Sequence, residues 1–536
     1  MFHQLLTPVN GSLGLSFLVA AIPIAVVLVM LGLLKRPAWQ SSLAGLVAGV
    51  IIALGVWKFP IGLAVSATLD GVTFALWPIM WIVFAALILY NVAVQSGRFD
   101  AFRRWVLKHL PDDRRIVLIV IGYGFGALLE GVTGFGAPVA ISASLLILLG
   151  FKAVDAVVYA LLFNTAPVAF GSLGIPITVL SGVTALPADA LGAMVGRQLP
   201  FFAFLLPFYV IAMYGGIKSV KALFPVIFVA GASFALIQFA TSNYVSYVLT
   251  DVLAALSSLL ATVLFLRVWK PAPDPAFAIG AAPAQSVNPE HSAVPPWQGW
   301  LPWLIMCAVV ILWTIFKVAG MGQMNIQWPG LHNQVFITLY EKPYAAIWSF
   351  QPLATGTAVL VTAIITAFAV GQGVGGLLKA TMLAWKQVLL PTLTVMAIVG
   401  LAFLMNYSGM AYTLGKAVAA AGFLFPLLSA FLGWLAVFLS GSDSSGNALF
   451  GNLQVVAARQ LHLDPVLMAA TNSSGGVMAK MISPQNIATG VAVSGLQGQE
   501  GAIFSRTFLH SILLTVLLGI LVFLQQHVWT WMIPPH

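Results

Sequence analysis

Two acidic residues lie in glycine-rich interruptions of otherwise apolar sequence. Sequence this apolar places their carboxyl groups inside a membrane. Glu130 is followed by Thr133 and Gly134, and Asp443 lies in a run of Ser, Gly and Asn. A charge near the bilayer centre costs roughly 2.5 to 3.5 kcal/mol on insertion scales. Burial favours the neutral form of a carboxyl group, so proton uptake is a natural way to remove this charge. Glu130 or Asp443 is therefore hypothesised to carry a coupling proton; the alternative is an acid that caps a helix at the membrane interface.

The polar residues around these and two further interruptions are candidates for binding an anion. The second pair of breaks covers residues 164–178 and 472–489, and each is expected to end a helix at its proline, Pro176 or Pro484. Half-helix N-termini exposed at such breaks present free N–H groups and a positive dipole end to an anion. Lys480 lies in the later break and offers a direct partner for a carboxylate; the alternative is a snorkelling or ion-paired lysine.

Arg197 and Arg506 each open a late apolar run, and a guanidinium can bind a carboxylate through two hydrogen bonds. They are expected either to touch the substrate or to stabilise the fold by pairing with Glu130, Asp443 or backbone carbonyls. No catalytic residue or metal ligand is predicted. The predicted binding residues are Thr133, Gly134, Asn164, Arg197, Ser442, Ser444, Ser445, Asn472, Lys480 and Arg506.

Composition shows what must position these residues. The chain has 536 residues, 60% of them hydrophobic and 7% charged, whereas a soluble domain carries about 25% charged residues. Apolar runs long enough to cross a bilayer recur along the chain, which predicts an all-α polytopic membrane protein of about 12 to 14 transmembrane helices. The net charge of +9 comes mostly from Lys and Arg in short loops, so nucleic-acid binding is not expected. The single cysteine, Cys307, excludes an internal disulfide.

The basic residues between 98 and 115 predict a cytoplasmic loop, which places the N-terminus outside. The first apolar run, residues 13–34, is expected to be a retained helix, because no cleavage pattern follows it. Residues 271–298 are rich in Pro and Ala and predict a cytoplasmic linker. The linker would separate a first membrane repeat with extra helices, residues 1–270, from a second repeat, residues 299–536.

The two halves show similar features at a nearly constant offset. The Glu130 and Asp443 interruptions correspond, as do Asn164 with Asn472, Pro176 with Pro484, and Arg197 with Arg506. Counting the crossings between basic loops gives the halves opposite orientations, which predicts inverted repeats with re-entrant hairpins and broken helices. In such proteins the substrate site lies near the bilayer midplane, at the interface of the repeats.

Other classes of membrane protein fit less well. Residues 409–416 are the nearest match to a phosphate-binding loop, but their glycine spacing is wrong, so an ATP-driven pump is not expected. An intramembrane enzyme is disfavoured because Asp443 and the serines near Ser473 have no second catalytic group at a recognisable spacing. A channel would also use polar breaks, but it could not accumulate its solute.

Together these motifs resemble the bacterial L-lactate permease family over nearly the whole chain. The resemblance is carried by residues 129–138 (LEGVTGFGAP), 164–171 (NTAPVAFG), 441–447 (GSDSSGN) and 472–486. It implies a multi-pass protein of the bacterial inner membrane that takes up L-lactate, and also D-lactate and glycolate, by proton symport. The implied partners are a small monocarboxylate, protons and the lipid bilayer, with no cofactor. A sodium-coupled or broader carboxylate transporter is the alternative. The family resembles a wider ion-transporter superfamily with paired re-entrant hairpins.

Overall fold

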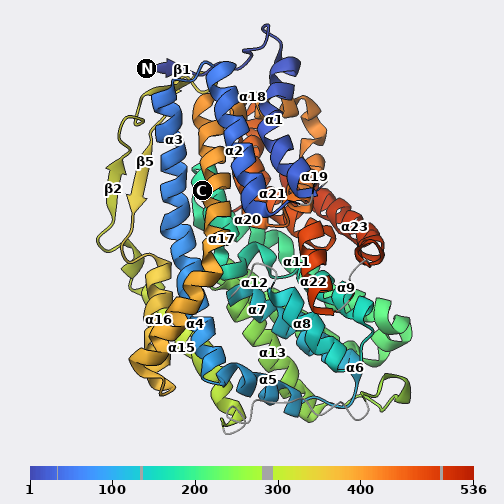
Figure 1. Cartoon of the computed structure of the whole chain (residues 1–536). Helices are drawn as coiled ribbons and strands as arrows, with labels where there is room; N and C mark the ends of the chain where they lie inside the picture. Colours follow the sequence, from blue (N-terminus) through green and yellow to red (C-terminus); the bar gives the residue numbers. More distant parts are fainter. Residues whose placement is uncertain are drawn as a thin grey trace.

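The computed structural model describes residues 1–32, 34, 36–132, 137–279, 294–494, 496 and 499–535. Within these residues eleven helices are long and apolar enough to cross a membrane, or twelve if one bent pair counts as a single span. The predicted all-α polytopic membrane fold is therefore confirmed. The count of eleven is one below the expected 12 to 14 spans, and the count of twelve is at the lower limit. Figure 1 shows the spans packed side by side in one elongated bundle.

The helices alternate with short 3-10 or π-helical segments, labelled η. Those before the linker are α1 (Leu13–Gly32), α2 (Ala38–Gly55), α3 (Ile61–Phe74), η1 (Ala75–Met80), α4 (Trp81–Gln95), α5 (Arg98–Lys108), α6 (Arg114–Val117), η2 (Leu118–Phe125), α7 (Gly126–Val132), α8 (Ala137–Leu148), α9 (Ala153–Phe163), η3 (Val168–Phe170), α10 (Gly171–Thr184), α11 (Ala188–Ala222), α12 (Phe224–Tyr244), α13 (Thr250–Val268) and η4 (Pro275–Phe277).

The later helices are η5 (Pro296–Trp300), α15 (Leu301–Ile315), η6 (Val318–Gly320), α16 (Thr355–Ala369), α17 (Gly373–Ser408), α18 (Met410–Val418), η7 (Ala419–Leu424), α19 (Phe425–Ser440), α20 (Asp443–Gln460), α21 (Pro465–Ala479), η8 (Lys480–Ile482), α22 (Pro484–Ser494), α23 (Glu500–His527) and η9 (Thr530–Met532). The strands are β1 (Phe2–His3), β2 (Met324–Gln327), β3 (Val335–Ile337), β4 (Lys342–Pro343) and β5 (Ile347–Phe350).

The expected break in the first half is a bend of 63° between α9 and the segment Val168–Thr184. The backbone is left-handed at Ser172, Leu173 and Gly174, and regular helix resumes around Pro176. The corresponding segment of the second half breaks at η8, and α22 begins at Pro484. The prediction that both prolines end helices is thus wrong. They stand where helical segments start, because a proline in the first turn has no N–H that the helix would need.

The two halves interlock through their breaks. Helix α10 packs on α20, and α22 packs on α8; likewise α11 contacts α21, and α23 contacts α9. Each contact joins an element of one half to an element of the other, and each has a counterpart with the halves exchanged. This reciprocity is what two repeats related by a pseudo-two-fold axis would produce. The inverted orientation and the boundaries 1–270 and 299–536 stay predictions.

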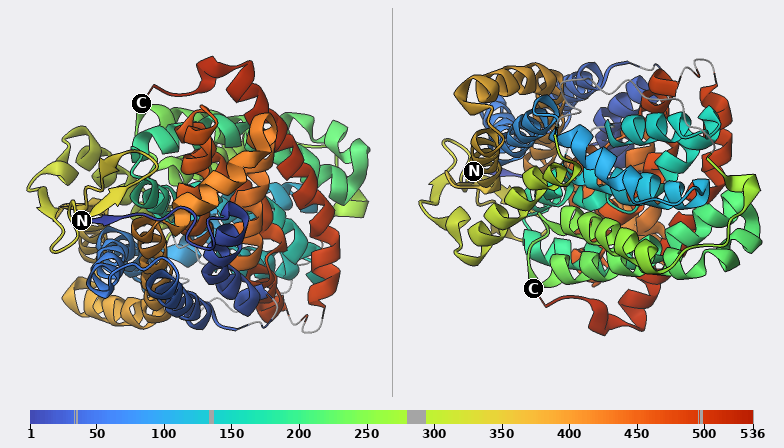
Figure 2. Two further views of the ribbon diagram at one scale, coloured as in Figure 1. Left: turned by 90° about the horizontal axis from the view of Figure 1, so that it is seen from above. Right: turned by 90° about the horizontal axis from the view of Figure 1, so that it is seen from below.

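A small β lobe, which the sequence analysis did not anticipate, lies along one side of the bundle, toward the end where the chain begins (Figure 1). Strand β1 pairs in parallel with β3, which pairs with β4, and β2 pairs antiparallel with β5. Seen from both ends, the strands lie at the edge of the helical bundle (Figure 2). The lobe thus ties the N-terminal residues to the segment that follows α15.

The basic residues of the predicted cytoplasmic loop lie at the opposite end, around α5 and α6 (Figure 1). The first residues of the linker pack onto this loop. Arg115 forms an ion pair with Asp274 at 3.3 Å, and the Arg114 Nε donates to the carbonyl of Ala278 at 3.1 Å. Residues 280–293, most of the predicted linker, lie outside the described residues. The described first residues of the linker therefore lie at the same end of the bundle as the basic loop.

Labelling of introduced cysteines tests the predicted orientation. Because Cys307 is the single cysteine, Cys307→Ser gives a cysteine-free background. Lys342→Cys, in the exposed strand β4, should react with an impermeant maleimide from outside the cell. Asp112→Cys, exposed beside α6, should react only after the membrane is opened. Reaction of both variants from the same side would contradict the arrangement.

Candidate functional site

A cavity of about 370 Å³ lies where the breaks of the two halves meet. Its wall includes both acids singled out from the sequence, Glu130 and Asp443, together with Lys480. The other lining residues are Pro37, Ala38, Trp39, Val168, Gly171, Ser172, Ile175, Pro176, Leu390, Pro391, Thr394, Val395, Ser440, Gly441, Ser442, Ser444, Ser445, Gln485, Asn486 and Thr489. The structure thus brings residues more than 300 positions apart in the chain to one buried space.

The central contact of the cavity is an ion pair between the two halves. The Lys480 Nζ donates to the Glu130 Oε1 at 2.7 Å, and the two side chains are 7% and 4% exposed. The Asn164 Nδ2 donates to the other carboxylate oxygen, Oε2, at 2.9 Å. The attraction between the two charges and these hydrogen bonds offset part of the cost of burying them. The ion pair with Glu130 therefore holds the lysine at the cavity wall.

The space beside Glu130 depends on a glycine. A Cβ at Gly171 would lie 2.8 Å from the Glu130 Oε1, a separation that real Cβ atoms do not show. Ser172, the next residue, has a left-handed backbone with a φ of 46° and faces the cavity. Non-glycine residues in this region cost free energy and tend to cluster at functional sites. The start of α10 is thus shaped around the carboxylate.

Asp443 lies at the tip where α19 turns into α20. Gly441 makes the turn with a φ of 71°, and Ser442 caps α20 by accepting from the Ser445 N–H. The Ser473 Oγ donates to the Asp443 Oδ2 at 2.5 Å, and the Asn447 Nδ2 lies 3.5 Å from the same oxygen. The Oδ1 has no partner among the described residues. Asp443 is thus fixed by one carboxylate oxygen and free at the other.

A chain of buried side-chain amides connects the turn between α19 and α20 to helix α10 of the first half. The Asn447 Nδ2 donates to the carbonyl of Pro176 at 3.1 Å, and the Asn472 Nδ2 donates to the Asn447 Oδ1 at 3.0 Å. The Gln454 Nε2 in turn donates to the Asn472 Oδ1 at 3.2 Å. Asn472 therefore supports the cavity from behind: it lies inside the unbroken helix α21 and does not line the cavity. Asn164 has a similar supporting position behind Glu130.

Two helix N-termini face the cavity. The first turn of α20 contributes Ser444 and Ser445, and the first turn of α22 contributes Gln485 and Asn486. The Asn486 Nδ2 donates to the carbonyl of Gly441 at 3.0 Å, which joins the starts of the two helices. Backbone N–H groups and the helix dipoles make this part of the wall electropositive. Together with Lys480 it suits a small anion.

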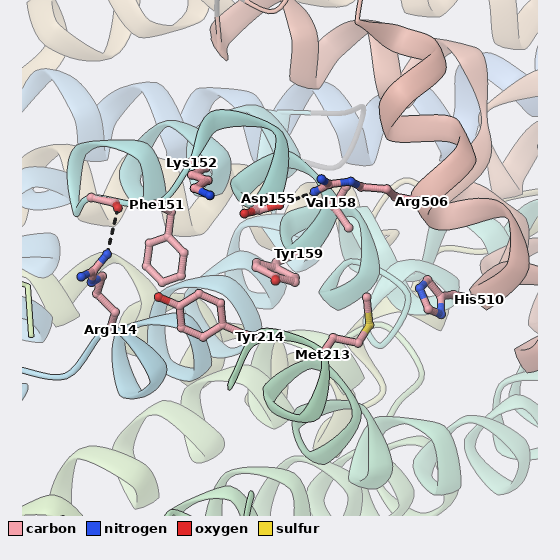
Figure 3. A pocket seen from close by; sticks show the side chains of 11 residues that line it. Arg114, Phe151, Lys152, Asp155, Val158, Tyr159, Met213, Tyr214, Arg506 and His510 are labelled. Atoms are coloured by element: carbon pink, nitrogen blue, oxygen red, sulfur yellow. Dashed lines mark hydrogen bonds and ion pairs between the residues drawn. The ribbon is translucent and has the colours of Figure 1, made fainter. Parts of the chain in front are cut away.

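The two arginines do not reach this cavity. The Arg197 Nε donates to the Asn243 Oδ1 at 2.7 Å, and its Nη1 donates to the carbonyl of Met532 at 3.0 Å. Arg506 forms an ion pair with Asp155 beside a separate cavity of about 640 Å³, which Arg114, Lys152 and His510 also line (Figure 3). Neither pairs with Glu130 or Asp443, so the geometry favours a fold-stabilising role for Arg197. A substrate contact in the cavity would require each arginine to leave its present partner.

Ser442, Ser444, Ser445 and Lys480, which the sequence predicts to bind substrate, all line one cavity, and their binding role stays a prediction. Thr133 and Gly134 lie outside the described residues. The sequence analysis did not single out every residue of the site. It missed Ser473, which holds Asp443, and Gln485 with Asn486. The adjacent Pro484 was a usable signal for the last two, because a helix starting there exposes its first turn. Nothing in the sequence of α17 distinguished Pro391 or Thr394 as cavity residues.

Two interlocked sets of broken helices around a buried, charged cavity define a polytopic membrane permease. The L-lactate permease family model matches residues 16–529. The chain is 42% identical to "Glycolate permease GlcA" of Escherichia coli (strain K12) and 40% identical to "L-lactate permease" of Bacillus subtilis (strain 168), with 99% of each chain covered in both comparisons. The chain therefore belongs to the L-lactate permease family, as its motifs predicted, and is a multi-pass protein of the bacterial inner membrane.

A solved structure supports the fold. MtrF of Neisseria gonorrhoeae, described as illuminating a class of antimetabolite efflux pumps, matches with a TM-score of 0.51. The match covers 94% of this chain and 97% of MtrF, at 12% sequence identity. At that identity the similarity concerns the fold alone and leaves the substrate open.

The free energy of unfolding should depend strongly on the buried ion pair. Glu130→Gln leaves Lys480 charged and unpaired, at an expected cost of about 3–5 kcal/mol. Adding Lys480→Met should recover much of this loss, because no unpaired charge then remains. The control is Asp155→Asn, which breaks the more exposed pair with Arg506 and should cost at most about 1 kcal/mol. Denaturant unfolding of the purified wild-type protein and of the three variants measures these losses; equal losses for Glu130→Gln and Asp155→Asn would contradict the role given to the buried pair.

A single methyl group at residue 171 should disturb the cavity. Gly171→Ala places its Cβ against the Glu130 carboxylate and should destabilise the protein by about 1–3 kcal/mol. Gly62→Ala is the matched control, because nothing lies within 4 Å of its added Cβ. Thermal unfolding of the two variants should show a lower midpoint for Gly171→Ala only. Equal midpoints would show that the contact with Glu130 is loose.

Proposed function

We propose that this chain takes up L-lactate, and also D-lactate and glycolate, together with a proton across the inner membrane. Relatives named for L-lactate and glycolate permeases align with it over nearly their whole length. These substrates are small 2-hydroxy monocarboxylates. The cavity supplies the groups that such a molecule needs.

The observation that carries the proposal is the position of Lys480. It is a buried cation on the wall of the cavity, paired with Glu130. A monocarboxylate brings one negative charge and can share or take over the ammonium group. The serine hydroxyls at the start of α20 line the same cavity and can hydrogen-bond a carboxylate or a 2-hydroxyl group. One bound anion would therefore replace contacts that the lysine already makes.

The rest of the wall fits the small size of the substrate. A volume of about 370 Å³ is near the lower end of ligand pockets, which run from about 300 to 1,000 Å³. Ile175, Leu390, Pro391 and Val395 supply an apolar side. The methyl group of lactate, or the corresponding hydrogen of glycolate, can lie against it. Tolerance of both substrates follows because such a surface discriminates weakly between a methyl group and none.

A proton is proposed as the coupling ion because buried carboxyl groups lie at the site. Moving an anion into a low-dielectric cavity is unfavourable unless a positive charge accompanies it. The sequence singles out Glu130 and Asp443, which both line the cavity, as the candidates for the group that accepts the proton. Asp443 has a free oxygen, whereas Glu130 gains one if the substrate takes Lys480. Either acid would bind a proton without any cofactor.

Transport by purified protein in proteoliposomes tests the proposal. Labelled L-lactate should show counterflow, with D-lactate and glycolate as competitors, and an inward proton gradient should drive its accumulation. Lys480→Met should reduce counterflow by at least tenfold. Lys379→Met, which removes an exposed lysine of α17, should leave it unchanged.

The outcomes separate the rival functions. A channel would equilibrate lactate without accumulating it. Accumulation driven by sodium and not by protons would refute the proton as coupling ion while keeping the carrier. Full counterflow in Lys480→Met would refute the role given to the cavity.

A further inference from the structure

The structure contains a third acid near the cavity, Asp251, in the first turn of α13. Its side chain is completely buried, and neither carboxyl oxygen has a hydrogen-bond partner among the described residues. By comparison, Glu130 has Lys480 and Asn164, and Asp443 has Ser473. Asp251 is not on the cavity wall, and no sequence motif singled it out. A buried carboxyl group without partners calls for a physical explanation.

Asp251 lies directly behind the Glu130 segment. A Cβ at Gly131 would be 2.9 Å from the Asp251 Oδ2, so its carboxyl group rests on the backbone of the residue that follows Glu130. Through Gly131 it adjoins Glu130 of α7, whose ion-pair partner is Lys480 of η8. Tyr123 of η2 is also near, but its hydroxyl donates to the carbonyl of Ala203 at 2.8 Å. Helices α10 and α12, which also pack on α13, bring no charged residue.

Ionised Asp251 would be unstable in this arrangement. A buried carboxylate with no hydrogen bond, beside a lysine that is already paired with another acid, costs several kcal/mol, and the negative charge of Glu130 adds to the cost. The neutral acid costs only the lost hydrogen bonds of a polar group, roughly 1–3 kcal/mol. The neutral form of Asp251 is therefore the less costly one in this arrangement, in which Lys480 pairs with Glu130.

We propose that Asp251, in place of the cavity-wall acids Glu130 and Asp443, is the proton-binding site of the symport, and that its carboxylate and the substrate carboxylate alternate as the second partner of Lys480. This inference rests on the proposed function. Proton binding neutralises the Asp251 carboxylate, which then no longer attracts the Lys480 ammonium group. The ammonium group can then pair with the substrate carboxylate as well as with Glu130. After the substrate leaves, Asp251 releases its proton, and its carboxylate is again stabilised by Lys480. One proton crosses with each substrate molecule.

Counting charges shows why the two movements are linked. Asp443 is the same in every state and is left out of the sums. With both proton and substrate bound, Glu130, Lys480, neutral Asp251 and the carboxylate sum to one negative charge. With neither bound, Glu130, Lys480 and ionised Asp251 also sum to one negative charge. Substrate without the proton would bury a second net negative charge beside the first, which is strongly unfavourable. Proton binding therefore precedes substrate binding.

The variant Asp251→Asn tests this assignment, because an amide has the shape of the neutral acid and cannot release a proton. It should retain lactate counterflow, which needs no net proton movement, and lose more than tenfold in accumulation driven by a pH gradient. Its apparent affinity for lactate should no longer fall as the pH rises. Asp70→Asn is the matched control. Asp70, in α3, is also buried, but it accepts a hydrogen bond from the Tyr407 hydroxyl at 3.1 Å and does not line the cavity. It should keep wild-type accumulation.

Wild-type accumulation in Asp251→Asn would overturn the assignment. If the wild-type protein itself shows counterflow but no response to a pH gradient, the proposed proton coupling fails instead. Infrared spectroscopy decides the case in which Asp251→Asn folds poorly or loses counterflow. The substrate-free wild-type protein should show the C=O stretch of a protonated carboxylic acid that exchanges slowly with deuterium and is missing in the variant. Spectra without that difference would also overturn the assignment.

Discussion

The cost of holding charge inside a membrane determines the organisation of this protein. Lys480 and Glu130 come from different halves of the chain and are almost fully buried, so each requires the other. Their contact therefore fixes how the breaks in the two halves approach each other. The glycine at residue 171 and the amide of Asn164 complete the surroundings of the carboxylate. Any anion that enters the cavity must compete for contacts within this arrangement.

The broken helices supply the second requirement, which is an electropositive wall without further buried cations. Helices α20 and α22 begin at the cavity, and the Asn486 side chain joins the two starts. Backbone N–H groups can bind a carboxylate without carrying a full charge that would need its own partner. This explains how one lysine suffices for a monocarboxylate. It also explains why unwound backbone occurs at this depth, since the interlocked halves and the cavity satisfy its polar groups.

Much of this architecture could be predicted from the sequence because hydrophobic length and interruption are local properties. The polytopic helical fold, the breaks near Pro176 and Pro484, and the family were all evident. Whether a helix ends or begins at each proline was not evident, because a proline can occupy the first turn of a helix or follow the end of the preceding one. The β lobe was missed because its strands are short and pair across distant parts of the chain. Arg197 and Arg506 appeared suited to the site by residue type, but their neighbours Asn243 and Asp155 are set by tertiary packing. Asp251 was missed for the same reason: nothing local shows that a carboxyl group lacks partners.

We propose that the Lys480 ammonium group binds the substrate carboxylate. A structure determined with L-lactate bound, at a pH that favours uptake, measures this directly. The account predicts the carboxylate within hydrogen-bonding distance of the Lys480 Nζ, with the methyl group toward Ile175 and Val395. Lactate bound instead beside Arg506 and Lys152, with Lys480 still paired only to Glu130, would contradict it.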